Sequence, residues 1–438
     1  MVLIKKYKNK EIAIYGMGIT GCSAAKTFKK MGAKVFCWDD NKKVRQKAKK
    51  LKYTVEKFWL KKKIDKILIS PGIDIKKCKI KKYIKKNLKK TFTDLDLFFE
   101  LNQKALIISI TGTNGKSTTC KIIEKILKTA KYNVKTVGNI GNPILYSISK
   151  KKKYIYILEV SSYQLQYSKL FRSKHAAILN ISPDHLERHK NISNYVKTKS
   201  KIFFAQNSLD YLYINSENKY SKLIKKIFKQ KKIKSKLITI NKNKFTFLLK
   251  RINNKYFSSK GNFENLVFSF KIAKKLNIKN KIIIKALNKF KGLPHRQEVI
   301  FSNKKIICVN DSKATSFDAC AQSLANYDKI YWIVGGLPKH KDIFNLKDVK
   351  KRIIKAYIVG NKTNFFKQKI KNNVQYQISK NLNNALKNIC NDLILDKNVK
   401  KTILLSPAAA SFDQFKNFET RGLYFKNLVK KYKRRLSA

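Results

Sequence analysis

Short apolar runs alternate with longer stretches of mixed polarity along nearly the whole chain. The runs are rich in β-branched residues, as in EIAIY (11–15), ALIISI (105–110), HAAILNI (175–181), IYWIVGG (330–336) and KTILLS (401–406). Runs that stay apolar, instead of alternating with polar residues, are typical of strands that are buried on both faces. Together with the helix-length segments between them, they predict an α/β protein with parallel sheets.

These runs fall into three clusters, which end near residue 70, span 105–181 and begin after 304. A chain of 438 residues is too long for one ordinary core, so several domains are expected. We predict domains at 1–95, 96–293 and 294–438, with boundaries in TFTDLDLFF (91–99) and KGLPHRQE (291–298). The Lys- and Asn-rich stretch 216–260 has no clear pattern, so its structure is the least certain.

The net charge of +74 is extreme and would normally suggest a nucleic acid or an anionic membrane as partner. The lysines, however, are spread over the whole chain without a basic arm, and Ile and Asn are abundant beside them. Most are therefore expected to be solvated surface residues, and no specific nucleic acid is predicted. No run is long enough for a membrane span, and the seven cysteines form no CxxC pair. We expect a cytoplasmic monomer.

The first candidate motif is GMGITG (16–21), which follows a predicted strand and opens a predicted helix. Its glycines would let the backbone approach a diphosphate at the helix N-terminus. Asp39 and Asp40 end the next strand, where an acid would bind a ribose, and SPG (70–72) ends another at the same sheet edge. The motif alone also fits a dinucleotide dehydrogenase or an ordinary tight turn.

The second motif is ITGTNGKSTTC (110–120), between a strand and a helix. A phosphate-binding loop has four residues between its first glycine and Gly-Lys-Ser/Thr, but only two stand here. The backbone of Gly112, Thr113, Asn114 and Gly115 could still cradle a polyphosphate. Lys116 would reach the β- and γ-phosphates, and Ser117, next to Thr118, would ligate Mg²⁺. The alternative is a plain turn before a helix.

The third motif joins EVSSYQL (159–165) with NISPDHLERH (180–189). Glu159 ends one apolar strand and His185 follows another, so a carboxylate and an imidazole could share a metal at adjacent strand ends. His189 lies in the same segment, but for this second histidine a structural role is favoured.

Two further motifs lie near the C-terminus. VNDSKATSFDA (309–319) places Asp311 and Lys313 after a strand, where helix capping accounts for neither residue. LLSPAAASFDQFKNFETRG (404–422) contains small residues that permit close approach to a ligand or a second domain. Thr315, Ser316 and Ser411 have helix capping as their simpler interpretation.

Together the motifs resemble the Mur ligase family over essentially the whole chain. TGTNGKST (111–118) is similar to the short ATP loop of that family, and GNIGNP (138–143) and GGLPK (335–339) also match. The loop alone would equally admit other Mur ligases and folylpolyglutamate synthetases, whereas SPAAASFDQFKNFETRG resembles the members that add D-glutamate. The resemblance implies a Rossmann-like N-terminal domain, a central P-loop-type ATPase domain with a parallel sheet, and a C-terminal Rossmann-like α/β domain.

The resemblance also implies a reaction. ATP would phosphorylate the L-alanine carboxylate of UDP-N-acetylmuramoyl-L-alanine, and D-glutamate would attack the acyl phosphate, giving a peptidoglycan precursor. Two Mg²⁺ ions are expected, with Ser117, Glu159, His185 and a carbamylated Lys199 as ligands. Lys199 is favoured over its neighbours Lys197 and Lys201 by its spacing from Tyr195. Lys116, His185 and Lys199 would be the catalytic residues.

The remaining site residues are implied by the same resemblance. The ATP site would include residues 112–118 together with Asn262, Asn265, Arg296 and Asp311. The UDP-muramoyl site would include Ile19, Thr20, Asp39, Ser70, Pro71, Gly72, Asn139 and Gln164. The D-glutamate site would include Lys313, Thr315, Lys339, Ser411 and Phe418, with Lys341 as the alternative to Lys339.

Overall fold

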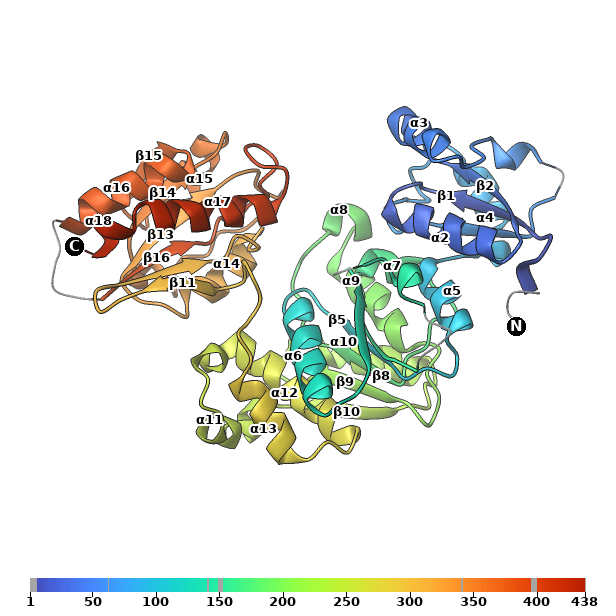
Figure 1. Ribbon diagram of the computed structural model, residues 1–438, viewed down its shortest axis with the longest axis horizontal. Helices are drawn as coiled ribbons and strands as arrows, with labels where there is room; N and C mark the ends of the chain where they lie inside the picture. Colours follow the sequence, from blue (N-terminus) through green and yellow to red (C-terminus); the bar gives the residue numbers. More distant parts are fainter. Residues whose placement is uncertain are drawn as a thin grey trace. The chain divides into compact units, whose positions relative to one another are not determined.

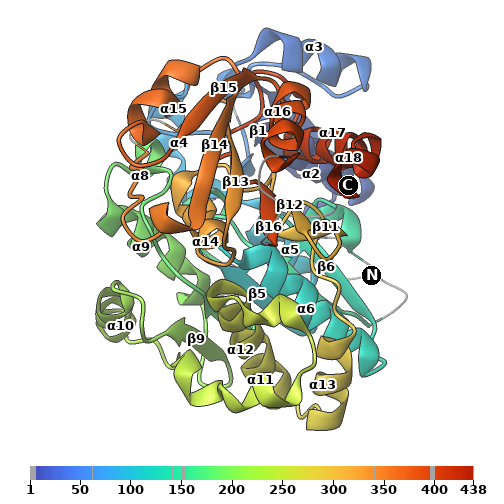
Figure 2. The same cartoon turned by 90° about the vertical axis from the view of Figure 1, so that its left-hand side faces the viewer.

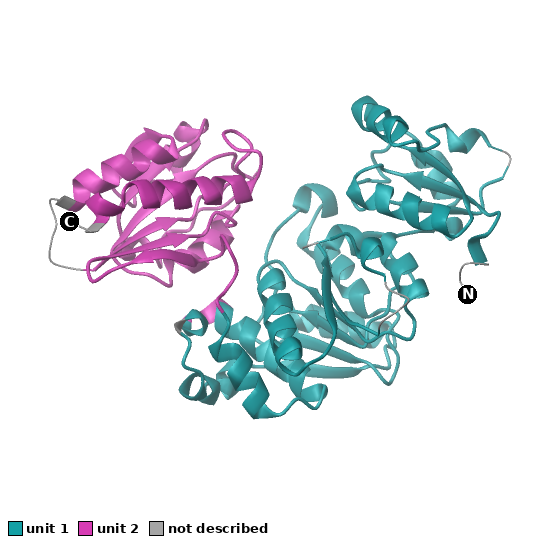
Figure 3. Ribbon diagram, in the orientation of Figure 1, with its two compact units in different colours: residues 1–258, 262–290 teal, residues 259–261, 291–438 magenta. Residues whose placement is uncertain are grey.

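A computed structural model of the chain describes residues 6–61, 63–139, 142–148, 153–339, 342–394 and 400–437. Its backbone contacts divide the chain into two compact units, 1–258 with 262–290, and 259–261 with 291–438 (Figure 3). The first unit contains two separate sheets and the second contains one. The predicted boundary near 293 lies close to this division, while the one near 95 falls between the two sheets of the first unit.

The N-terminal sheet consists of four parallel strands in the order β2-β1-β3-β4. Figure 1 labels β1 and β2 of this sheet together with the helices α2, α3 and α4. Helix α2 packs on one face through Phe28, and α4 packs on the other through Ile84. The elements in chain order are β1 (Glu11–Tyr15), α2 (Ile19–Lys30), β2 (Lys34–Trp38), α3 (Lys42–Lys50), β3 (Lys66–Ile69), α4 (Lys81–Lys86) and β4 (Thr91–Phe92).

The central sheet consists of six parallel strands in the order β10-β9-β8-β5-β7-β6. Neighbouring residues of β5 face opposite cores, since Ile107 packs with α5 and α9 while Ile108 packs with α6 and α12. Burial on both faces explains why apolar residues dominate this strand instead of alternating with exposed polar ones.

The elements of this central part are α5 (Asp94–Leu101), β5 (Ile107–Thr111), α6 (Lys116–Thr129), β6 (Val134–Gly138), β7 (Ile155–Glu159), α7 (Ser162–Gln166), β8 (His175–Ile178), α8 (Leu186–His189), α9 (Ile192–Ser200), β9 (Tyr211–Asn215), α10 (Ser221–Gln230), β10 (Lys236–Ile240), α11 (Phe247–Arg251), α12 (Lys260–Lys275) and α13 (Asn280–Asn288). The unpatterned stretch 216–260 thus contains α10, β10 and α11. Ile224 and Ile227 bury the inner side of α10, although lysines surround them in the sequence.

The second unit contains a six-stranded sheet in the order β11-β12-β16-β13-β14-β15, in which only the edge strand β11 is antiparallel. Helices α14 and α15 cover one face, and α16 and α17 cover the other (Figure 2). Its elements are β11 (Glu298–Ser302), β12 (Ile306–Asn310), α14 (Phe317–Leu324), β13 (Ile330–Gly335), β14 (Ile353–Val359), α15 (Thr363–Ile370), β15 (Tyr376–Lys380), α16 (Leu382–Ile394), β16 (Lys401–Leu405), α17 (Phe418–Lys431) and α18 (Lys433–Ser437).

The seven cysteines are all free thiols, and six of them are buried. Among the described residues, no helix is both long and apolar enough to cross a membrane.

Candidate active site

The loop 112–115 joins the carboxyl end of β5 to the first residue of α6. Gly112 and Gly115 have φ angles of +154° and +82°, which residues with a side chain rarely adopt. A Cβ on Gly115 would also lie 2.2 Å from Asn265 Oδ1. Both glycines are therefore required by the conformation of the loop. The loop leads directly into a helix N-terminus, which is a favourable place for a phosphate.

The Lys116 side chain folds back over this loop. Its Nζ donates hydrogen bonds to the carbonyl oxygens of Gly112 at 2.8 Å and Thr113 at 2.6 Å. The amine is thus held against the backbone of the loop in which the sequence analysis expected a phosphate ligand.

Asn180, which the sequence analysis did not select, fixes the shape of the loop. Its Oδ1 accepts from the Asn114 amide at 2.9 Å, and its Nδ2 donates to the Asn114 carbonyl at 3.2 Å. Its own carbonyl accepts from the Thr113 amide at 2.9 Å. Asn180 stands shortly after β8 in the segment already noted for His185, and position at that sheet edge was the signal that could have revealed it.

Ser117 and Glu159 come together next to the loop. Ser117 Oγ donates to Glu159 Oε2 at 2.5 Å, and Asn139 Nδ2 donates to Glu159 Oε1 at 2.9 Å. This hydroxyl and carboxylate are oxygen donors of the kind that Mg²⁺ prefers, and they lie where phosphate oxygens could complete the coordination. The residues present therefore fit a magnesium ion. No group of three or more His, Cys, Asp and Glu side chains that could hold a metal occurs in the described part of the chain.

His185 has a left-handed backbone with a φ of +54°. Its Nδ1 lies 3.2 Å from the Tyr163 hydroxyl, and its Nε2 lies 3.4 Å from Asp184 Oδ2. His189 is buried, its Nε2 is 3.0 Å from Ser162 Oγ, and burial lowers its pKa to about 4. A neutral, enclosed imidazole agrees with the structural role that the sequence analysis favoured for this second histidine.

Lys199 is only 1% exposed, which is unusual for a lysine. Its Nζ donates to the Gly112 carbonyl at 2.9 Å and to Thr111 Oγ1 at 3.3 Å. Burial and the nearby Lys116 charge hold its pKa well below the usual value. Lys197 is exposed, and the Lys201 amine donates to the Gln166 carbonyl. Of these three lysines, Lys199 is the one whose amine contacts the phosphate loop.

The turn after β1 is linked to both neighbouring strand ends of the N-terminal sheet. The Met17 amide donates to Asp39 Oδ2 at 2.8 Å, and Ser70 Oγ donates to the Gly16 carbonyl at 2.6 Å. A Cβ on Gly21 would lie 1.9 Å from the Gly16 carbonyl oxygen, so the helix meets the turn at very close range. Asp39 and Ser70 thus lie beside the glycine turn.

The other predicted substrate residues of this unit have varied surroundings. Ile19 is 75% exposed at the start of α2, followed by the half-buried Thr20. A Cβ on Gly72 would meet nothing within 4 Å, so the turn after Pro71 faces open space. Gln164 is buried, and its Oε1 accepts from the Ser161 amide at 3.1 Å in a capping box.

Asn262 and Asn265 both lie on α12 of the first unit. Asn262 Nδ2 donates to the Tyr256 carbonyl at 3.0 Å, and Asn265 Oδ1 accepts from Thr119 Oγ1 at 3.2 Å. Asn265 therefore lies against the first turns of α6, directly behind the phosphate loop.

The second unit gathers its predicted residues at the carboxyl ends of β12, β13 and β16. Lys313 Nζ lies 3.7 Å from the centre of the Phe418 ring, which brings two predicted D-glutamate residues together. Asp311 is buried and accepts from Ser323 Oγ at 2.5 Å and Ser406 Oγ at 3.0 Å. Burial raises its pKa to about 6. Arg296, Thr315 and Lys339 are half-buried, Ser411 is buried, and Lys341 lies outside the described residues.

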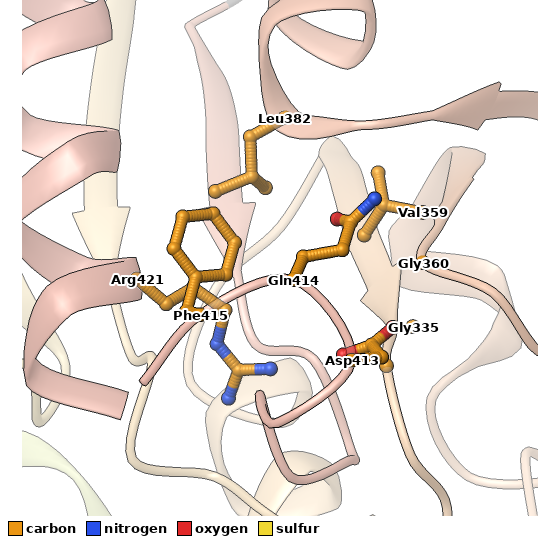
Figure 4. A pocket seen from close by; sticks show the side chains of 9 residues that line it. Gly335, Val359, Gly360, Leu382, Asp413, Gln414, Phe415 and Arg421 are labelled. Atoms are coloured by element: carbon orange, nitrogen blue, oxygen red, sulfur yellow. The ribbon is translucent and has the colours of Figure 1, made fainter. Parts of the chain in front are cut away.

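Arg421 connects the segments that carry these residues, although the sequence analysis did not select it. Its Nε donates to Ser312 Oγ at 2.9 Å, and its Nη2 donates to the carbonyls of Ser312 at 2.8 Å and Ala409 at 3.0 Å. Burial lowers the pKa of its guanidinium to about 10. Figure 4 shows this side chain beside Asp413 in a small cavity lined by Gly335, Gly336, Val359, Gly360, Leu382, Asp413, Gln414, Phe415 and Arg421.

Comparison with known proteins identifies the family. Residues 110–286 match the Mur ligase middle domain, and residues 10–90 match the MurD-like N-terminal domain of Mur ligases. A UDP-N-acetylmuramoylalanine–D-glutamate ligase of Rickettsia felis is 36% identical over 98% of this chain and 99% of its own length. The chain belongs to the Mur ligase family. As a Mur ligase it belongs to a family that uses ATP, which implies Mg²⁺.

Two further comparisons agree with this assignment. The enzyme of the same name from Rickettsia bellii is 35% identical to this Mur ligase and covers 96% of the chain and 97% of its own length. The crystal structure of a UDP-N-acetylmuramate–alanine ligase from Thermotoga maritima covers 97% of this chain and 99% of its own, with a TM-score of 0.53 and 14% identity. The fold is therefore the α/β fold with parallel sheets and three domains that the sequence analysis predicted.

Proposed function

We propose that this Mur ligase joins D-glutamate to UDP-N-acetylmuramoyl-L-alanine with the consumption of ATP, and so makes a peptidoglycan precursor. The observation that carries the proposal is the match at 36% identity, over nearly the full length of both chains, to a relative named for that reaction. The phosphate loop supports it, because its two glycines have positive φ angles and the Lys116 amine lies against the loop backbone.

In the proposed reaction, different residues stabilise the transferred phosphoryl group and hold the metal ion. A carboxylate is a poor electrophile, so ATP transfers its γ-phosphoryl to the L-alanine carboxylate and creates a leaving group. Lys116 and the amides at the N-terminus of α6 stabilise the negative charge on the transferred group. Ser117 and Glu159 would hold Mg²⁺, which neutralises charge on the phosphates when it is bound. His185, Arg296 and Asp311 are proposed to complete the site for the second ion and the nucleotide.

Lys199 is proposed to be carbamylated. Its buried amine has a lowered pKa, and the neutral amine is the form that adds to CO₂ with loss of one proton. The product would replace the amine next to the Gly112 carbonyl with an anionic oxygen ligand for a second Mg²⁺. The hydrogen bond from Nζ to the Gly112 carbonyl supports this assignment, because it keeps the Lys199 amine next to the phosphate loop.

The amino-acid site is proposed to lie in the second unit. Lys313 and Lys339 would pair with the carboxylates of D-glutamate, while Thr315, Ser411 and Phe418 would shape the pocket around it. The stacking of Lys313 over the Phe418 ring supports this grouping, because it orients an ammonium whose charge suits a dicarboxylate. We also propose that the enzyme acts as a monomer in the cytoplasm.

A phosphate-release assay tests the proposal. The purified chain is mixed with ATP, Mg²⁺ and UDP-N-acetylmuramoyl-L-alanine, and then with D-glutamate, L-glutamate, L-alanine or meso-diaminopimelate in turn. Release is expected with D-glutamate only, and omission of the muramoyl nucleotide should abolish it. Equal rates with L-glutamate or meso-diaminopimelate would show that the proposed amino acid is wrong.

A further inference from the structure

One guanidinium on α8 binds three successive backbone carbonyls of the turn that follows β3. Arg188 Nη2 donates to the Ile73 carbonyl at 2.5 Å and, more weakly, to the Pro71 carbonyl at 3.4 Å. Its Nη1 reaches the Gly72 carbonyl at 3.4 Å. These bonds join the central part of the first unit to the N-terminal sheet, across more than a hundred residues of sequence.

Residues of the central part of the first unit hold the Arg188 guanidinium in place. Arg188 Nε donates to Gln166 Oε1 at 2.7 Å, and its planar group lies over the rings of Tyr163 and Tyr167. The Tyr167 hydroxyl accepts from the Ile75 amide at 3.1 Å, so it holds the same turn a few residues further on. Arg188 and Tyr167 therefore form a clamp on residues 71–75.

The clamp also decides which way the amides of the turn point. In a trans peptide the C=O and the following N–H point in opposite directions. Since the Pro71 and Ile73 carbonyls face Arg188, the amides of Gly72 and Asp74 face away from it. Gly72 borders open space, because a Cβ built there would meet nothing within 4 Å. An anion at the carboxyl end of β3 would therefore approach these two amides from the side opposite Arg188.

We propose that Arg188 is a positioning residue that holds the turn 71–74 in the conformation that binds the diphosphate of the nucleotide precursor. This inference rests on the proposed function. Arg188 acts through the turn. It also follows His185 by three residues on the same segment, so it connects the substrate turn to the segment that carries a proposed metal ligand. A lysine could not replace it, because a single ammonium cannot span three carbonyls as the planar fork does.

The test compares Arg188→Met and Arg188→Lys with Lys190→Met, a matched control that removes one positive charge from an exposed lysine two residues away. In the ligand-free proteins, hydrogen exchange of the Ile75 amide should accelerate about tenfold or more in both Arg188 variants and stay unchanged in the control. In the ligase assay, KM for the muramoyl nucleotide should rise about 10- to 100-fold in Arg188→Met, and less in Arg188→Lys. KM for ATP should change less than about twofold.

Two results would overturn the inference. One is unchanged exchange at Ile75 in Arg188→Met, and the other is an equal rise in KM for both nucleotides, which would indicate general damage instead of positioning. The exchange measurement needs no substrate. If the wild-type chain fails to turn over with D-glutamate, the proposed function fails, while the exchange result still decides whether Arg188 holds the turn.

Discussion

Gly115→Ala should destabilise the first unit and weaken ATP binding together. Alanine at a φ of +82° must adopt the left-handed region, which costs roughly 1–2 kcal/mol. The new Cβ would also lie 2.2 Å from Asn265 Oδ1 and 3.0 Å from its Cγ, so Asn265 must move. Asn265 is buried and accepts the hydrogen bond from Thr119, whose loss adds about 1 kcal/mol. The expected total is about 2–3 kcal/mol.

Urea unfolding followed by fluorescence measures this change, and Gly72→Ala is the matched control. Gly72 has open space around the Cβ position and no positive φ, so its substitution should change the free energy of unfolding by less than about 0.5 kcal/mol. Titration of ATP in the ligase assay should show a raised KM in Gly115→Ala only, because the displaced loop changes the approach to the N-terminus of α6.

A double variant separates the cost of the left-handed backbone at residue 115 from the cost of the clash with Asn265. Asn265→Ala removes the obstructing side chain, so Gly115→Ala in that background should retain the cost of the backbone and lose about 1 kcal/mol of the total. Strict additivity of the two substitutions, or a change below about 0.5 kcal/mol in Gly115→Ala itself, would refute the reasoning.

Three further predictions concern charged side chains. Lys116→Ala should lower kcat by about 10²–10³-fold in the phosphate-release assay with an unchanged circular dichroism spectrum, and near-normal turnover would remove Lys116 from the site. Lys199→Ala should lose most of the ligase activity and regain part of it when acetate is added. The exposed control Lys197→Ala should keep full activity. Equal ligase rates in the two variants would indicate that another lysine is the modified one. Asp94 is buried, and its Oδ1 has no hydrogen-bond partner among the described residues. Burial raises the pKa of this carboxyl from 3.8 to about 6. Its ionisation therefore destabilises the folded state as pH rises from about 4 to about 6. Asp94→Asn should therefore raise the free energy of unfolding at pH 7.5 by up to about 3 kcal/mol and flatten its pH dependence between those values, and an unaltered pH profile in urea unfolding would contradict this.

The motifs that could be found in the sequence are short segments. Each contains both the residues that set the backbone conformation and the side chains that would contact the ligand. Gly112, Gly115 and Lys116 lie within five residues, and their roles follow from the rules for left-handed glycines and phosphate contacts. The β5 run was equally readable, because burial on both faces favours apolar residues at most positions of the strand. The stretch 216–260 gave no such signal, since its lysines cover the outer sides of helices whose buried residues are few and widely spaced.

Asn180 and Arg421 were missed for the opposite reason. Each acts on residues that are distant in sequence, Asn180 on Asn114 and Arg421 on Ser312 and Ala409. Neither lies in a spacing pattern that local rules recognise. Lys199 differs from these two residues, because its spacing from Tyr195 already favoured it over Lys197 and Lys201. The structure adds that Lys199 is buried and that its amine contacts the Gly112 carbonyl.

The sequence by itself determined the α/β class, the short phosphate loop and the strand ends at which the site residues stand. These features depend on backbone conformation and strand burial, which residues close together in the sequence specify. The tertiary structure decided which side chains hold that loop and the substrate turn, as Asn180 and Arg188 do. Contacts of that kind depend on where parallel strands end relative to one another in space, and the pairing order of a parallel sheet is not written in any local stretch of the chain.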